Sequence, residues 1–169
     1  LRALRRMLRP GGTITVIEGD HGTTTFHPDS AAAHAAIDAL VTLQARSGGD
    51  ATIGRRVYVI GGDGRRLFES IRLAGPIIGT PAIGNIDADP ALEIVATANT
   101  GAGYPSLYIF DLPNNLWTTP VSDAAPSFSA PIGQSKSSPA LGKGLQSDSY
   151  LSIFVTTVGN ALQWWKWTG

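Results

Sequence analysis

The sequence contains no cysteine and only one methionine among its 169 residues. The lack of cysteine excludes disulfide bonds and thiolate metal sites, but it does not indicate a compartment, because cysteine-free chains occur in all of them. No apolar run approaches the ~20 residues that a membrane-spanning helix requires, so we expect no membrane span. Thirteen Lys and Arg balance thirteen Asp and Glu, and this neutrality argues against nucleic acid as a partner.

Glycine and proline, by contrast, are frequent, with 20 and 11 residues, which predicts a globular chain with many turns. The length suffices for one domain with a substantial core or for two small ones. The first residue is Leu, and nothing at this end looks like a signal sequence. We therefore expect the chain to be a piece of a longer protein.

The first third of the sequence alternates between helical and strand patterns. "LRALRRMLRPGG" predicts a helix that stops at Pro-Gly-Gly, and "TITVIEGD" predicts a β-strand. The strongest helical pattern lies in "HPDSAAAHAAIDALVTLQARSGG", where Asp29 or Ser30 can cap the first turn and Gly48 with Gly49 ends the helix. Residues 1–56 therefore read as an α/β fragment.

After Val57 the pattern changes to short β-rich runs separated by Gly, Pro, Asn and Ser, which predicts antiparallel sheet. The runs are "VYVIGGDG", "ALEIVATAN", "SLYIFDLPNN", "YLSIFVTTVGN" and "ALQWWKW". "GGDG", residues 61–64, is expected to be a hairpin turn. Residues 118–139 are expected to be an exposed irregular connection.

Residues 57–169 also contain a repeat. The segments 80–84, 92–97 and 107–110 recur as 138–142, 151–156 and 162–165, with offsets of 58, 59 and 55 residues, and residues 57–60 read as the end of an earlier copy. Such a period of short strands predicts β-propeller blades, although about two copies are too few to close a ring. The alternative is that similar hairpins recur in an ordinary β domain.

The segment "AIGNIDADPALEIVAT", residues 82–97, spaces oxygen-bearing groups as a metal-binding loop does. Calcium takes about six to eight oxygen ligands. The side chains of Asn85, Asp87, Asp89 and Glu93 and the carbonyl of Ala91 supply five ligand positions, and water can complete the shell. We therefore predict a Ca²⁺ site at these five residues.

The alternative is a polar turn in which Asn and Asp side chains accept hydrogen bonds from nearby backbone N–H groups. Pro90 favours this alternative, because its fixed φ excludes the left-handed residue that such metal loops usually place there. The matching loop of the next copy, "GKGLQSDSYLS", keeps only Asp148 and is not expected to bind metal.

Two other residue groups are weaker candidates for function. His21 follows the predicted strand and is the one candidate for a catalytic role, but the spacing of the three histidines matches no metal-ligand pattern. Trp165 and Trp167 are expected on one face of a strand and Trp164 on the other. They either form a platform for a carbohydrate or fill the core and a partly exposed edge.

The first part resembles the C-terminal part of class I S-adenosylmethionine-dependent methyltransferases. The resemblance spans residues 1–58, through "LRALRRMLRPGGTITVIEGDHG" and "FHPDSAAAHAAIDALVTLQARSGGDATIGRRVY". It implies a partial Rossmann-like sheet, with His21 near the methyl acceptor. The glycine-rich cofactor loop and the acidic ribose partner of that family are missing. S-adenosylmethionine is therefore expected to bind only in a complete parent, and methyl transfer by this chain alone is not expected.

The second part, residues 57–169, resembles the FG-GAP or VCBS-type β-propeller repeats. The residues that carry this resemblance are "TPAIGNIDADPALEIVAT" and "SLYIFDLPNNLW". It implies calcium binding and an unidentified protein or carbohydrate ligand. The two resemblances disagree on localisation, because the repeats suggest the cell surface or exterior and the methyltransferase part suggests the cytoplasm.

Taken together, the sequence predicts an α+β composite: a partial Rossmann-like α/β fragment at residues 1–56, followed by antiparallel β-propeller-like blades at residues 57–169. The predicted role is that of a non-catalytic, calcium-stabilised repeat module for ligand binding or adhesion. The alternatives are an inactive methyltransferase fragment, or two joined fragments without a common function. Each part lacks the neighbours that would cover its sheet edges, so we expect self-association.

Overall fold

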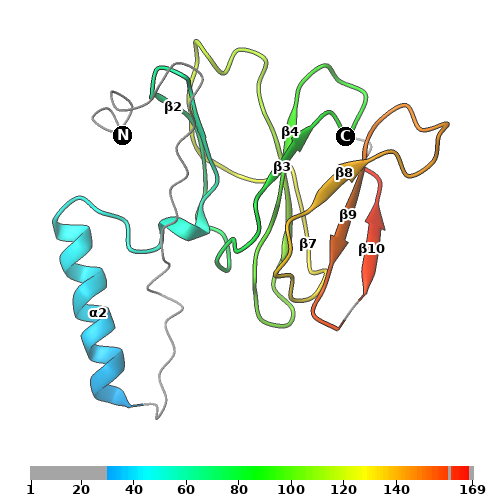
Figure 1. Ribbon diagram of the computed structural model, residues 1–169. Coiled ribbons are helices and arrows are strands. Elements are labelled where there is room, and N and C mark those ends of the chain that lie inside the picture. Colours follow the sequence, from blue (N-terminus) through cyan, green and yellow to red (C-terminus); the bar gives the residue numbers. More distant parts are fainter. Residues whose placement is uncertain (1–29, 160, 168–169) are drawn as a thin grey trace, which may run out of the picture. The chain divides into compact units, whose positions relative to one another are not determined.

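The computed structural model describes residues 30–159 and 161–167 (Figure 1). The chain divides into two compact units, Leu1–Gly54 and Arg55–Gly169, and each is described by itself. The predicted helix in residues 1–12, the predicted strand in residues 13–20 and His21 lie outside the described residues. Within the described residues, no helix is both long and apolar enough to cross a membrane.

The first unit contains one described helix, α2 (Ala31–Arg46). Ser30 is its N-cap, and the Ser30 hydroxyl accepts a 3.1 Å hydrogen bond from the N–H of Ala33. At the other end Gly48 takes a positive φ of 77°, and the N–H of Gly49 donates to the carbonyl of Gln44 at 2.8 Å. This helix and both of its ends are confirmed as predicted, although none of its residues is buried. The short 3₁₀ turn η2 (Ile53–Arg55) follows.

The second unit is built from ten described strands in three open sheets (Figure 1). The first sheet has the order β1-β2-β6, the second β3-β4-β5-β7, and the third β10-β9-β8. The strands are β1 (Tyr58–Ile60), β2 (Arg66–Ser70), β3 (Ala82–Gly84), β4 (Glu93–Thr97), β5 (Leu107–Asp111), β6 (Val121–Ala124), β7 (Phe128–Ala130), β8 (Ala140–Gly142), β9 (Ser152–Thr156) and β10 (Leu162–Trp165).

All strand pairs are antiparallel except β2 with β6, so the predicted antiparallel character is largely confirmed. The hairpin turn at residues 61–64 is also confirmed, with β1 and β2 on either side. The N–H of Gly64 donates to the carbonyl of Gly61 at 2.8 Å, and Gly64 takes a φ of 84° that favours glycine. The described part of the chain is therefore mostly β, with open sheets and a single helix.

The four-stranded sheet lies between two hydrophobic cores. All five residues of its strand β4 are therefore buried. Ile94 and Ala96 belong to the core shared with the first sheet, where Phe68 packs edge-to-face on Phe110 at a centroid distance of 5.7 Å. Val95 belongs to the core shared with the third sheet. Neighbouring side chains on a strand point to opposite faces, so one strand supplies both cores.

The two predicted copies fold in the same way. Strands β3, β4 and β5 form an antiparallel meander with β4 in the centre, and β8, β9 and β10 form another with β9 in the centre. The four-stranded sheet has the additional strand β7 beside β5. The repeat read from the sequence is therefore a repeat of strand arrangement.

The prediction that residues 118–139 form an exposed irregular connection is right in part: most of these residues are exposed or half-buried, but the segment contains two short strands. Strand β6 pairs in parallel with β2, and β7 pairs with β5. Ser106 is fully buried beside this segment; its hydroxyl donates to the carbonyl of Gly133 at 2.7 Å and accepts from the N–H of Ile132 at 3.1 Å. Pro and Ser obscure the strand pattern here, and strands distant in sequence supply the pairing partners.

We predict that Ser106→Ala will lower the free energy of unfolding by about 1–3 kcal/mol, because it leaves the buried N–H of Ile132 without this partner and removes the bond to the carbonyl of Gly133. The matched control is Ser129→Ala on β7, where the serine is exposed and the expected change is within about 0.5 kcal/mol. Urea unfolding of the whole chain measures both. Equal effects of the two variants would contradict the observed course of residues 128–133.

Candidate metal centre

Three carboxylates come together in the connection between β3 and β4. Asp87, Asp89 and Glu93 each place one carboxylate oxygen within 4.8 Å of the others, and Asp87 and Glu93 are buried. The register explains this, because Gly84 at the end of β3 lies opposite Glu93 at the start of β4. The connection from 85 to 92 leaves and returns beside Glu93, so residues of this short loop meet the first side chain of β4.

Part of the loop is a hydrogen-bonded turn of the kind that the alternative prediction described. Asp87 Oδ1 accepts from the N–H of Asp89 at 3.0 Å, and Asp89 Oδ1 accepts from the N–H of Ala91 at 2.7 Å. The Asn85 Nδ2 donates to the carbonyl of Asp89 at 2.5 Å. These bonds use one oxygen of each aspartate, so the turn holds the carboxylates in place and leaves their second oxygens for a ligand.

Glu93 is the unusual member of the cluster because its side chain is completely buried. Its Oε2 accepts a 2.7 Å hydrogen bond from the N–H of Ile86, but its Oε1 is buried without a hydrogen-bond partner among the described residues. Asn85 Oδ1 is in the same situation. A buried oxygen without a partner is costly and needs an explanation, such as a bound ion.

The surroundings of Glu93 disfavour its ionised form relative to a carboxyl group in water. Burial raises its pKa above the ordinary value, and the N–H of Ile86 opposes this shift. The charges of Asp87, Asp111 and Asp89 raise the pKa further. Asp111 lies on β5 directly opposite Glu93. Three aspartates therefore oppose the negative charge of Glu93, and a divalent cation would favour it.

The cluster fits a hard cation. Its donors are oxygens, which suit Ca²⁺ or Mg²⁺ better than the softer metals that select thiolate or imidazole. With Ca–O distances of about 2.3–2.6 Å, two ligand oxygens can be up to about 4.6–5.2 Å apart, so oxygens that lie within 4.8 Å of one another can share one ion. The structure thus brings together Asp87, Asp89 and Glu93. The coordination roles of Asn85 and Ala91 stay predictions.

Pro90 is less of an obstacle than the sequence suggested. Among the described residues other than glycine, only Asp123 has a positive φ, and the loop from 85 to 93 contains no such residue. The chain therefore turns around the carboxylates without the left-handed position that Pro90 would exclude.

Comparison with known proteins gives no further guide to this site. No family model matches the chain, no curated protein matches it, and no solved structure matches it. The residues of the site themselves therefore carry the functional assignment.

The matching loop of the second copy has different electrostatics. Asp148 Oδ1 accepts a 2.6 Å hydrogen bond from Lys166, and Oδ2 accepts from the N–H of Leu145 at 2.8 Å. Lys166 chiefly, and the Leu145 N–H next, lower the pKa of the Asp148 carboxyl. A lysine thus neutralises the one acidic residue that this loop retains.

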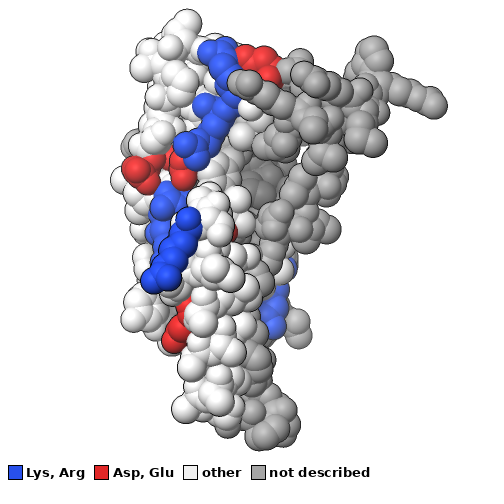
Figure 2. Space-filling model, turned by 90° about the vertical axis from the view of Figure 1, so that its left-hand side faces the viewer, with Lys and Arg blue, Asp and Glu red and all other residues white. Residues whose placement is uncertain are grey.

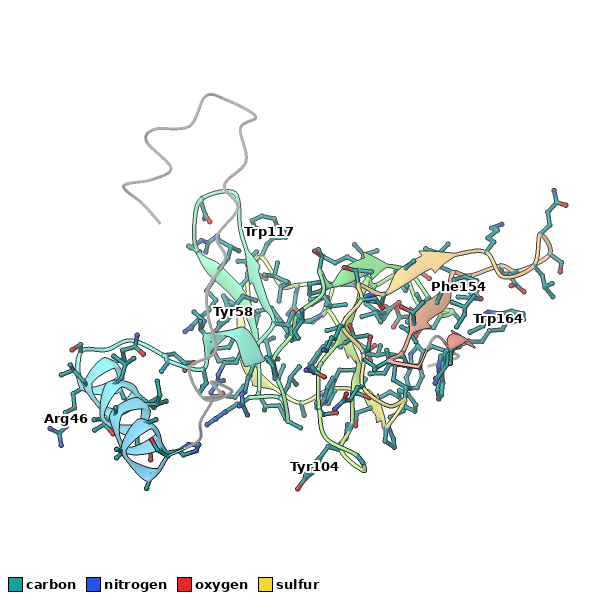
Figure 3. The ribbon with its side chains drawn as sticks, turned by 60° about the horizontal axis from the view of Figure 1, so that its bottom comes forward. Arg46, Tyr58, Tyr104, Trp117, Phe154 and Trp164 are labelled. Atoms are coloured by element: carbon teal, nitrogen blue, oxygen red, sulfur yellow. The ribbon has the colours of Figure 1, made fainter. Side chains whose placement is uncertain are left out.

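The tryptophans alternate as predicted. Trp165 and Trp167 are partly buried and lie 6.3 and 5.0 Å from the ring of Phe128. Trp164 projects from the opposite face, where it is half exposed and stacks on Phe154 at 6.4 Å (Figure 3). The core-and-edge interpretation therefore describes these side chains.

A groove beside the metal loop was not predicted from the sequence. It has a volume of about 310 Å³ and is lined by Ile86 and by residues of the third sheet and its loops, including Asp148, Tyr150, Lys166 and Trp167. Its lining joins three separate segments, at residue 86, residues 147–152 and residues 166–167, and no local pattern signals that proximity.

Basic side chains of the second unit lie next to acidic ones, as one face of the molecule shows (Figure 2). Arg66 pairs with Glu69 at 2.6 Å, and Arg56 pairs with Glu69 at 3.3 Å and with Asp123 at 2.9 Å. Glu69 therefore has cationic partners within the chain, in contrast to Glu93. The two glutamates form a matched pair for testing the charge of the cluster.

We predict that Glu93→Gln, measured in a chelator, will leave the free energy of unfolding unchanged or raise it by about 1 kcal/mol, because it removes a buried charge from a group of carboxylates. The matched variant Glu69→Gln should lower it by up to about 1 kcal/mol, because it weakens two ion pairs. Urea unfolding in EDTA measures both. A large loss in the Glu93 variant would show that the charge of Glu93 is compensated by the protein itself.

Proposed function

We propose that the second unit is a non-catalytic β-repeat module of the FG-GAP or VCBS type, stabilised by a calcium ion, which serves ligand binding or adhesion. The observation that carries the proposal is the buried Oε1 of Glu93, which has no hydrogen-bond partner among the described residues and belongs to a cluster of three carboxylates. The resemblance of residues 57–169 to these repeats and the two similar meanders support it.

The cation would be held by Asp87, Asp89 and Glu93, with the Asn85 side-chain oxygen, the carbonyl of Ala91 and water completing the shell. In this role it neutralises carboxylates that otherwise repel one another beside the first residue of β4. Calcium therefore acts as a structural ion here, and its affinity falls as the number of charged ligands falls.

The binding role rests on the surface that surrounds the loop. The groove next to Ile86 offers the rings of Tyr150 and Trp167 together with the Asp148–Lys166 pair, and Trp164 is half exposed nearby on β10. Rings with adjacent polar groups suit a protein or a carbohydrate ligand. In the same proposal the first unit is what remains of a methyltransferase, and S-adenosylmethionine belongs to a complete parent.

We predict that millimolar calcium will raise the melting temperature of the chain relative to EDTA. Binding to the folded state alone stabilises by about 2.7 kcal/mol when the ion exceeds its Kd a hundredfold, and an effect of this size is several degrees. Differential scanning calorimetry or circular dichroism measures it, with S-adenosylmethionine as the comparison ligand, for which no rise is expected.

The decisive variant is Asp87→Asn combined with Asp89→Asn, because asparagine keeps the side-chain oxygen that accepts the turn hydrogen bonds and removes the charges. Its melting temperature should not respond to calcium. Asp148→Asn in the second copy is the matched control and should respond as the parent does. A parent that melts cooperatively without any response to calcium would contradict the proposed function.

A further inference from the structure

We infer that the cation site regulates the docking of the third sheet, β8–β10, onto the four-stranded sheet. This inference rests on the proposed function, since it assigns a second consequence to the same ion. It concerns the seam at which the loop from 85 to 93 contacts the second copy.

The loop contacts both the four-stranded sheet and the third sheet. Ile86 is completely buried in the core that contains Val95 of β4 together with Ile153 and Val155 of β9. Its N–H is the group that donates to Glu93 Oε2 at 2.7 Å. The glutamate at the cation site therefore sets the backbone position of a residue whose side chain fills the seam.

Two further contacts tie the loop region to the third sheet. The N–H of Leu151, immediately before β9, donates to the carbonyl of Asn85 at 3.4 Å. At Gly84 a side chain would collide with the methyl groups of Leu141 and Leu151, at 2.8 and 3.0 Å from an added Cβ. The backbone of β3 at Gly84 thus lies against leucine side chains of the third sheet, and the next residue, Asn85, is hydrogen-bonded to Leu151.

The opposite end of the seam is held without the loop. Thr97 Oγ1 donates to the carbonyl of Ser137 at 2.7 Å, and Ser135 Oγ donates to the carbonyl of Thr156 at 2.9 Å. The N–H of Val158 donates to the carbonyl of Gln134 at 2.7 Å. Repulsion among the uncompensated carboxylates is therefore expected to open the seam at Leu151 and the start of β9, while these bonds keep its other end closed.

An ion that binds only the closed arrangement lowers the population of the open arrangement by a factor of one plus the ratio of the calcium concentration to its Kd. This change in population can be measured by hydrogen exchange. At calcium ten times above its Kd, hydrogen exchange in residues 151–155 should slow about tenfold relative to EDTA. Exchange in the hairpin of residues 58–70, which belongs to the first sheet, should change less than twofold. Mass spectrometry of the whole chain gives both segments in one experiment, and isothermal titration calorimetry measures calcium binding separately.

A matched pair of variants tests the route. Ile86→Val and Ile109→Val remove the same methylene group from the same core, but only Ile86 lies on the loop. We expect the calcium-dependent slowing at residues 151–155 to shrink several-fold in Ile86→Val and to stay unchanged in Ile109→Val. An equal reduction in both variants would overturn the role of the loop.

The outcomes separate this inference from the proposed function. Calcium binding with slower exchange only in residues 85–93, or with equal slowing in all three sheets, overturns the inference and leaves the metal site in place. No calcium binding in the calorimeter overturns the proposed function and the inference with it.

Discussion

The structure of the second unit depends on the burial of β4 on both of its faces. Each face of this strand contributes to a different hydrophobic core, and the cores join the four-stranded sheet to its two neighbours. A strand in this position has no surface on which to place a charge at low cost. Glu93, at the first position of β4, nevertheless carries a carboxyl group. The burial that stabilises the packing of this strand therefore disfavours the charge of its first residue.

Two interactions can stabilise the carboxylate of Glu93: a hydrogen bond within the protein and a bound cation. The hydrogen bond from the N–H of Ile86 satisfies one oxygen of Glu93. Asp87 and Asp89 make the charge harder to tolerate, although each is itself held by a turn that orients it toward the cluster. A bound cation, as proposed above, would supply charge and coordination to the second oxygen of Glu93, which has no partner in the described part of the chain. In the second copy the first residue of the matching strand β9 is Ser152, and the loop residue Asp148 pairs with Lys166.

Local patterns were sufficient where neighbouring residues decide the structure. The helix over Ala31–Arg46 has a serine cap and a glycine end, and the hairpin at residues 61–64 has the glycines that its turn requires. The clustering of Asp87, Asp89 and Glu93 was predictable for the same reason, because all three lie on one short connection between strands. The two strands within residues 118–139 were missed because β6 and β7 are stabilised by β2 and β5, which no local window contains.

The sequence by itself determined the change from helix to short strands near Val57, the repeated meander, and the acidic loop between its first two strands. These features follow from residue spacing, which controls which side chains share a face or a turn. Only the tertiary structure decided that Glu93 is completely buried, that one of its oxygens finds no partner within residues 30–159 and 161–167, and that Ile86 links this loop to the next sheet. Burial and unsatisfied groups are properties of packed surfaces, and surfaces formed by distant segments exist only after the chain has folded.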